Sequence, residues 1–232
     1  MSATVEKTYG SYHFGSLRDL TDQDMSQFIR LFNAPTDAVG SPLGGRSAVT
    51  IAQLEGIGSV VIKHYTRGGI IRHMVKKNYI KWGKTRSQLE YEALQNAARL
   101  GVNVPEPVAY SHQGILFYRA WLVTREIPQQ KTLAELSIID ERQARIAMKA
   151  VVNQIETLIR NNIHHADLHP GNILVKNTDR VFILDFDKSS ISRGSRNKLR
   201  DRYLRRWRRA VSKHRLPGLL SEMMRTGLQS DG

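Results

Sequence analysis

The segment spanning residues 164–187 concentrates side chains that could handle a proton and a metal ion. Asp167 and Asn172 are separated by four residues, and Asp185 follows thirteen residues later, directly after an apolar run that ends at Leu184. Carboxylate and amide oxygens suit Mg²⁺, and a carboxylate beside an alcohol can accept its proton. These residue types therefore suit phosphoryl transfer, which needs cations over the phosphoryl oxygens and a carboxylate beside the attacking hydroxyl.

The spacing of these residues resembles the HRDxxxxN and DFG template of kinases. In that template Asp167 would be the catalytic base, and Asn172 and Asp185 would bind Mg²⁺. A purely structural alternative is that Asp167 caps the turn before Pro170 and that Asp185 only ends a strand. The joint spacing, with His165 two residues before Asp167, favours the kinase-like site.

Composition sets further bounds on the chain. Its 232 residues suffice for one sizeable core or two small lobes. Cysteine is absent, which rules out disulfides and thiolate metal sites. No apolar run approaches the roughly 18 residues of a transmembrane helix, and the N-terminal residues lack the apolar core of a signal peptide. We therefore expect a cytoplasmic protein, or one bound to a membrane surface from that side.

The net charge of +14 is concentrated in two segments. Residues 188–215 carry twelve Lys and Arg against Asp201 alone, a local net charge of +11, and residues 63–86 carry eight without an acid. Such segments favour a polyanionic partner, which could be a nucleic acid, an anionic membrane or a phosphorylated lipid. The alternative is a solvated basic face without a partner.

Hydrophobic periodicity predicts an α+β fold. One predicted helix starts at residues 21–24. Three more span residues 87–100, 140–162 and 196–214. Predicted strands span residues 48–54, 58–63, 108–111, 115–118 and 121–126, with a turn at 55–58 and two more strands in the motif segment. This order predicts a bilobal, protein-kinase-like domain with a nucleotide cleft. The expected strand-rich N-lobe covers about 36–126, the truncated helical C-lobe about 127–215, and a short helical extension residues 1–35.

The apolar stripes of two helices define their expected buried faces. In the helix over residues 140–162, the stripe comprises Ile146, Ala150, Val151, Ile155, Leu158 and Ile159. In the last helix, the stripe comprises Leu199, Tyr203, Leu204, Trp207 and Val211, which leaves Arg202, Arg205, Arg206 and Arg209 facing outward. Because both aromatic residues lie on this stripe, they are expected in the core, and no nucleic acid is expected as a partner.

Other parts of the kinase template can be sought in the first half of the chain. Residues 60–63, VVIK, resemble the strand whose lysine holds the α and β phosphates, so Lys63 is the candidate. On the tetrapeptide alone, an exposed strand lysine without a phosphate partner is the favoured interpretation. The partner should be a glutamate on the following helix, and Glu90 and Glu92 are both candidates.

The phosphate-covering loop and the adenine-binding segment are less clearly marked. Gly44 and Gly45 precede the first strand of the hairpin, and their backbone would allow close approach to phosphate, although the spacing is not GxGxxG and a simple turn is an alternative. Glu126 falls at the expected lobe junction, where backbone groups normally bind adenine.

Several motifs resemble the lipopolysaccharide core kinases, and among them the 3-deoxy-D-manno-octulosonic acid (Kdo) kinases. The resemblance spans roughly residues 40–215. HADLHPGN places His169 where protein kinases usually carry lysine, and ILDFDKS places Asp187 where they carry glycine. The basic segment over residues 64–94 and the helix RNKLRDRYLRRWRRAVSK are also similar to that family. The pattern around Glu90 and Tyr91 favours Glu90 over Glu92 as the partner of Lys63.

The resemblance implies ATP-dependent phosphorylation, with Mg²⁺, of the 4-hydroxyl of the Kdo residue in Kdo-lipid A at the cytoplasmic face of the bacterial inner membrane. The roughly 45 residues after Asp185 are too few for the peptide platform of a protein kinase, which implies a small acceptor or one presented at a surface. A lipopolysaccharide heptose kinase, a RIO-like protein kinase and a non-catalytic nucleic-acid-binding module are the alternatives. The sequence leaves the oligomeric state open.

Overall fold

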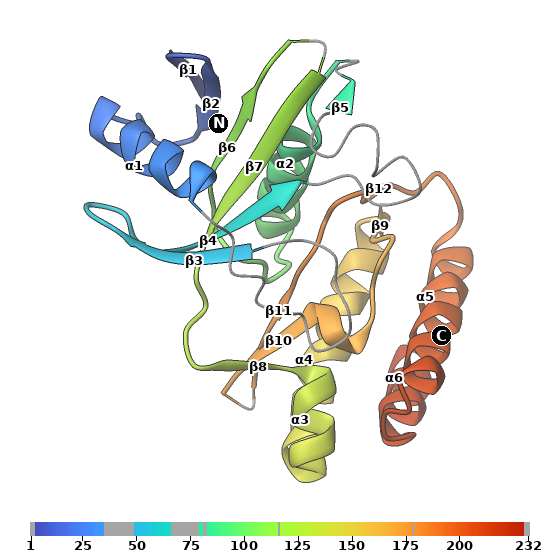
Figure 1. The fold of residues 1–232 in the computed structure, drawn as a ribbon. Coiled ribbons are helices and arrows are strands. Elements are labelled where there is room, and N and C mark those ends of the chain that lie inside the picture. Colours follow the sequence, from blue (N-terminus) through green and yellow to red (C-terminus); the bar gives the residue numbers. More distant parts are fainter. Residues whose placement is uncertain are drawn as a thin grey trace. The chain divides into compact units, whose positions relative to one another are not determined.

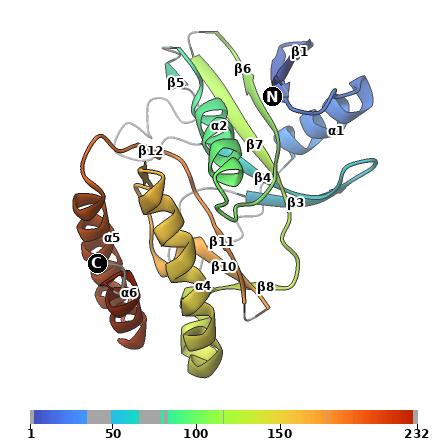
Figure 2. The same cartoon turned by 180° about the vertical axis from the view of Figure 1, so that it is seen from behind.

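The computed structural model describes residues 3–34, 49–65, 79–80, 83–115, 117–177 and 179–229. The chain forms two compact units (Figure 1; Figure 2). The first comprises Met1–Glu92 and Glu106–Glu126, and the second comprises Ala93–Pro105 and Ile127–Gly232. Helix α2 (Arg86–Arg99) begins in the first unit and ends in the second.

The first unit is built on an antiparallel sheet. Its strand order is β1-β2-β6-β7-β4-β3, and β5 pairs with β7 beside this path. The strands are β1 (Val5–Tyr9), β2 (Tyr12–Ser16), β3 (Val49–Leu54), β4 (Gly58–Tyr65), β5 (Tyr79–Ile80), β6 (Pro107–Gln113) and β7 (Phe117–Arg125). The predicted hairpin over residues 48–63 is confirmed, because β3 pairs with β4 down to Leu54 and Gly58.

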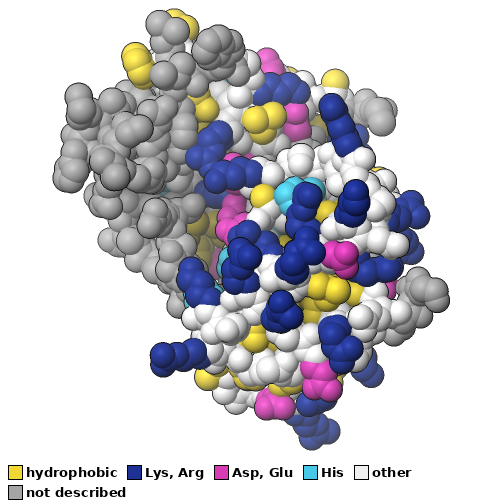
Figure 3. All heavy atoms as spheres, turned by 90° about the vertical axis from the view of Figure 1, so that its right-hand side faces the viewer, with side chains coloured by type: hydrophobic (Ala, Val, Ile, Leu, Met, Phe, Trp, Pro, Cys, Tyr) yellow, Lys and Arg dark blue, Asp and Glu magenta, His cyan; other side chains and the backbone are white. Residues whose placement is uncertain are grey.

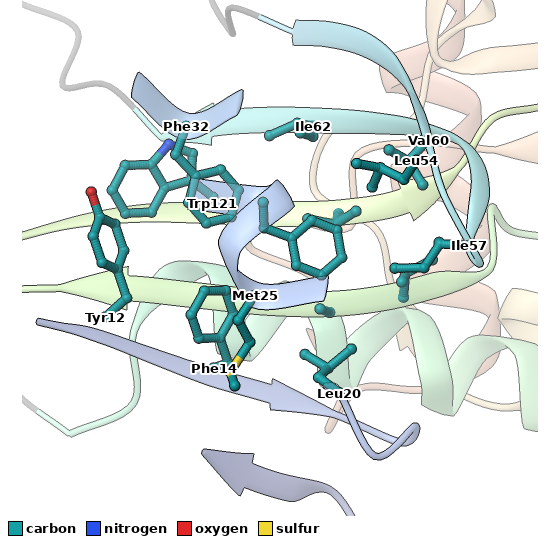
Figure 4. Packing of buried hydrophobic residues seen from close by; sticks show 14 residues of the cluster. Tyr12, Phe14, Leu20, Met25, Phe32, Leu54, Ile57, Val60, Ile62 and Trp121 are labelled. Carbon is teal, nitrogen blue, oxygen red and sulfur yellow. The ribbon is translucent and has the colours of Figure 1, made fainter. Parts of the chain in front are cut away.

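Helix α1 (Asp22–Asn33) covers one face of this sheet with apolar side chains (Figure 4). Its predicted start is confirmed, since Thr21 and Asp24 form a capping box. Phe28 and Phe32 are buried, and the ring of Phe32 stacks on Trp121 of β7 at 4.5 Å between centroids. Such aromatic pairs contribute beyond the area they bury, so this cluster fixes α1 against β7.

Two expectations for the first unit are wrong in detail. The extension over residues 1–35 is not purely helical, because β1 and β2 form a hairpin that joins the sheet through β6. No residue of β1 is buried, so its sequence lacks the alternation that marks a strand. The strands predicted at 115–118 and 121–126 are one strand, β7.

The second unit combines helices with short strands. Its helices are α3 (Leu133–Ile139), α4 (Glu141–Arg160), α5 (Arg196–Lys213) and α6 (Leu219–Gln229). Its strands are β8 (Gln130–Thr132), β9 (Ile163–His164), β10 (Ile173–Lys176), β11 (Arg180–Ile183) and β12 (Ser190–Ile191). β10 lies between β8 and β11, and β9 pairs with β12. Helices α3 and α6 were not predicted from the sequence.

The apolar stripes of α4 and α5 are confirmed with three corrections, the first of which is that Ala150 of α4 is only half-buried. Ile146, predicted on the buried face of α4, is 44% exposed, because the buried face runs through Ala144, Ala147 and Met148 instead. Leu204 of α5 is only half-buried. Helix α6 packs closely on α4, since a Cβ added to Gly227 would lie 2.7 Å from Val152.

Candidate active site

The strand pair β10 and β11 places two of the three candidate site residues at the same end of the pair. Asn172 directly precedes β10, and Asp185 lies two residues after β11. Because the antiparallel register matches Ile173 with Ile183, both residues emerge at the same end of the pair. The Leu184 amide donates to the Asn172 carbonyl at 2.9 Å, which extends this pairing up to Asp185.

His165 connects the segment of Asp167 to that of Asp185. Its imidazole Nδ1 accepts a hydrogen bond from the Asp167 amide at 3.3 Å, so the proton resides on Nε2, which lies 2.8 Å from the Leu184 carbonyl. Burial lowers the pKa of His165 to about 4, and the ring is therefore neutral near pH 7. Phe186 packs edge-on against the ring. His165 is thus a positioning residue that links the segment of Asp167 to the segment of Asp185.

Asn172 and Asp185 have geometries that suit oxygen ligands. The side-chain amide nitrogen of Asn172 donates to the Asp167 carbonyl at 2.9 Å, which leaves its amide oxygen as the atom available to a cation. Asp185 adopts a φ of 60°, in the left-handed region. A non-glycine residue held there costs on the order of 1–3 kcal/mol, and such residues cluster at functional sites.

The carboxylate of Asp167 has two basic neighbours. The guanidinium of Arg206, from α5, donates to Asp167 Oδ1, and His169 Nε2 lies 3.8 Å from the same oxygen. His169 Nδ1 accepts from the Gly171 amide, so Nε2 carries the proton that faces Asp167. Arg206 is exposed, as predicted, but its side chain also reaches the loop that carries Asp167, a contact that the sequence did not predict.

Tyr203 fixes α5 against the same loop. Its hydroxyl accepts a hydrogen bond from the His165 amide at 2.9 Å and donates to the Ile163 carbonyl at 2.5 Å. Burial raises the pKa of this hydroxyl, so it stays protonated and can donate. The sequence identified Tyr203 only as an apolar stripe residue. Its polar end also supports the loop of Asp167.

In the first unit, Lys63 of β4 and Glu90 of α2 form an ion pair. Lys63 Nζ lies 3.0 and 2.8 Å from the two carboxylate oxygens of Glu90, and the Tyr65 hydroxyl also donates to this carboxylate. The exposed fractions are 16% for the Lys63 side chain and 3% for that of Glu90. Glu92, the other candidate, pairs with Lys84 at the surface. The geometry therefore gives Lys63 a buried, oriented partner.

We expect Glu90→Gln to lower the free energy of unfolding by about 3 kcal/mol. This value is at the lower end of the loss for a buried ion pair that loses one partner, because Lys63 keeps some access to water. Glu92→Gln removes an exposed ion pair and should change the free energy of unfolding by less than about 1 kcal/mol. Urea unfolding of both variants measures the difference. Equal losses would show that the Lys63 pair does not depend on burial.

Of the remaining predicted site residues, the structure describes Glu126 but not Gly44 and Gly45. Glu126 directly follows β7, its amide donates to the Ser59 carbonyl at 3.1 Å, and its carboxylate accepts from the Ser59 hydroxyl. Both bonds fix the end of the first unit to the start of β4. Gly44 and Gly45 lie outside the described residues.

Comparison with known proteins gives the family of this chain. Residues 30–221 match the model of the lipopolysaccharide kinase (Kdo/WaaP) family. The chain belongs to this family. As a member of the Kdo/WaaP family it has the kinase-like α+β fold that the sequence predicted, with the strand-rich unit first and the helix-rich unit second.

Curated relatives are between 28% and 34% identical to this chain over the stretch that aligns. A 3-deoxy-D-manno-octulosonic acid kinase of Vibrio parahaemolyticus is 33% identical over 157 residues, which are 66% of this chain and 65% of the relative. That of Vibrio vulnificus is 34% identical over 68% of this chain and 66% of the relative. That of Xylella fastidiosa is 28% identical over 74% and 69%. The matched stretch thus spans slightly less than two thirds of the Vibrio proteins.

Proposed function

We propose that this protein transfers the γ-phosphoryl group of ATP to the 4-hydroxyl of the Kdo residue in Kdo-lipid A. The observation that carries the proposal is the bonded arrangement of Asp167, Asn172 and Asp185 in the second unit, where backbone and side-chain hydrogen bonds fix all three segments. Family membership supports it, as does the name of the relatives. The proposal takes the two units as lobes of one kinase-like domain, about 36–126 and 127–215.

In this reaction Asp167 orients the acceptor hydroxyl and accepts its proton. His165 holds the Asp167 amide, so the carboxylate projects from a rigid segment. Asn172 and Asp185 supply the two oxygens for Mg²⁺, which is ordinarily held by one or two protein oxygens together with phosphate oxygens. When bound, Mg²⁺ would neutralise negative charge on the transferring phosphoryl group.

Residues of the first unit bind the nucleotide in this proposal. Lys63, oriented by Glu90, contacts the α and β phosphates of ATP. Gly44 and Gly45, which lie outside the described residues, keep the phosphate-binding role that the sequence predicted. The backbone at Glu126, fixed by Ser59, binds the adenine ring.

The acceptor assignment rests on the relatives and on charge. Kdo bears a carboxylate and lipid A bears phosphates, so the acceptor is strongly anionic. Figure 3 shows the face that carries α5, on which many Lys and Arg side chains gather. The exposed basic residues of α5 comprise Arg196, Lys198, Arg202, Arg205, Arg206, Arg208, Arg209 and Lys213. We place the protein at the cytoplasmic face of the inner membrane, held there by attraction to anionic lipid.

The helices that the structure describes include none that is long and apolar enough to cross a bilayer.

The proposal is tested by incubating the purified protein with ATP, Mg²⁺ and Kdo-lipid A, and by analysing the lipid by mass spectrometry. We expect the addition of one phosphate, located on Kdo by fragmentation. A heptosylated acceptor and a reaction without lipid are run in parallel. Phosphate found only on heptose, or only on the protein itself, would contradict the proposed acceptor.

Asp185→Asn should weaken ATP binding in the presence of Mg²⁺, because a carboxylate ligand becomes a neutral amide. We expect a loss of at least about tenfold, since even changes beyond the direct ligands cost about 10- to 100-fold in metal affinity. Titration calorimetry at several Mg²⁺ concentrations measures the effect, which excess Mg²⁺ should partly reverse. ATP affinity without Mg²⁺ is the internal control. An unchanged affinity with Mg²⁺ would remove Asp185 from the proposed ligands.

A further inference from the structure

Helix α5 presents a basic side chain to the proposed catalytic carboxylate. Tyr203 and Arg206 are three residues apart, so they lie on neighbouring positions of one helix face. The hydroxyl of Tyr203 is bonded to both Ile163 and His165, which fixes this face against the loop of Asp167. Arg206 is therefore held near Asp167 by the fold itself.

The contacts made to Asp167 are unequal for its two oxygens. Arg206 and His169 both approach Oδ1. Among the described residues, no side chain donates a hydrogen bond to Oδ2. If Oδ2 receives the acceptor hydroxyl, the acceptor binds to the same carboxylate that Arg206 contacts through Oδ1.

Arg206 has donors beyond the one that Asp167 engages. A guanidinium carries five N–H donors in a planar fork that matches a carboxylate in two parallel hydrogen bonds. The Arg206 side chain is 43% exposed, so the unused edge of this fork can be reached from solvent. The known contact of Arg206 uses one nitrogen, Nη2.

Arg202 adds a second positive charge near this position. Burial and then the charges of Arg202 and Arg206 lower the pKa of His164. Burial also lowers the pKa of His169, and Arg206 and His214 act in the same direction while Asp167 opposes them. The region next to Asp167 therefore favours a negative group on the substrate.

The proposed acceptor carries a negative group at a suitable place. An octulosonic acid has its carboxylate attached to C2, and the 3-deoxy position separates C2 from C4 on the ring. When the 4-hydroxyl lies at Oδ2 of Asp167, the carboxylate is only two ring carbons away. It is therefore within reach of a guanidinium that touches the same aspartate.

We propose that Arg206 binds the carboxylate of the acceptor sugar while it holds Oδ1 of Asp167, and that this contact selects acidic sugars. The inference rests on the proposed function and adds the group that recognises the acceptor. It gives Arg206 a role distinct from membrane attachment.

The test uses two soluble, deacylated acceptors that differ only at the sugar carboxylate, which is free in one and converted to the carboxamide in the other. Wild-type protein should prefer the free acid. Arg206→Gln should raise KM for the acid by at least about tenfold, as expected when a charged group loses its hydrogen-bond partner. KM for the carboxamide should change little, so the preference is lost. Arg206→Lys should restore part of the preference. Arg208→Gln, an exposed change on the same helix, is the matched control and should keep it.

The results distinguish a failure of the proposed role of Arg206 from a failure of the proposed kinase activity. If wild type phosphorylates the free acid and Arg206→Gln lowers turnover of both acceptors by the same factor, Arg206 only orients Asp167 and the inference fails. An equal preference of the wild type for acid and carboxamide also contradicts it. If wild type phosphorylates neither acceptor and also leaves intact Kdo-lipid A unmodified, the proposed function fails and the inference fails with it.

Discussion

Asp167→Asn should lower the turnover number for acceptor phosphorylation by about 100- to 10,000-fold, the usual loss when a general base is removed. The change is nearly isosteric and removes the proton acceptor and its charge. The Asp167 backbone contacts to His165 and Asn172 do not involve the carboxylate, so the loop should keep its conformation.

ATP affinity provides the first control for this variant. It should stay within about threefold of wild type, because Asp167 contacts the acceptor and not the nucleotide in the proposed reaction. Asp179→Asn, an exposed change in the turn between β10 and β11, is the matched second variant and should retain turnover. Steady-state kinetics with Kdo-lipid A measures all three proteins. Turnover of Asp167→Asn within threefold of wild type would exclude Asp167 as the base.

Reversing three charges on α5 should release the protein from anionic membranes. Arg205, Arg209 and Lys213 are exposed and spaced by four residues, so they form one stripe. Each charge near an anionic surface contributes on the order of 1 kcal/mol, so changing all three to Glu should weaken binding by several kcal/mol at low salt. Arg206 is left unchanged because it contacts Asp167.

Sedimentation with anionic phospholipid vesicles at low and high salt measures this effect. The matched control is a variant in which three exposed basic residues of α4 are changed to Glu, namely Arg142, Arg145 and Lys149. This variant alters the net charge by the same amount as the α5 variant. Activity of the α5 variant should fall more on membrane-embedded Kdo-lipid A than on a deacylated acceptor, and the gap should widen as salt is lowered. Equal losses on both acceptors at every salt concentration would show that these side chains act in the fold or the active site.

The sequence predicted elements well where one face is buried against the unit's own core. The period of apolar residues located α4 and α5 within two residues at each end. The strand β1 was missed because its side chains have no buried face. Helix α6 has buried residues at Leu220, Met224 and Leu228, a helical spacing that a search beyond residue 215 could have found.

The candidate site shows a similar division between local and long-range information. Spacing in the motif segment was enough to propose Asp167, Asn172 and Asp185, because short strands and turns place them. The pairing of Lys63 with Glu90 rather than Glu92 also has a local signal, since Glu90 shares a helix face with the buried Leu94 and Ala97. The contact of Arg206 with Asp167 joins residues 39 apart in sequence and depends on how α5 packs, so no local pattern reveals it.

The two hydrogen bonds of the Tyr203 hydroxyl bear on where this protein can be shortened. A fragment that ends before α5 would lose the partner of both the Ile163 carbonyl and the His165 amide, and these groups are buried in the intact chain. It would also lose the Asp167 contact of Arg206. The smallest fragment that keeps the loop of Asp167 supported therefore extends through α5, although the sequence motif itself ends at Asp187.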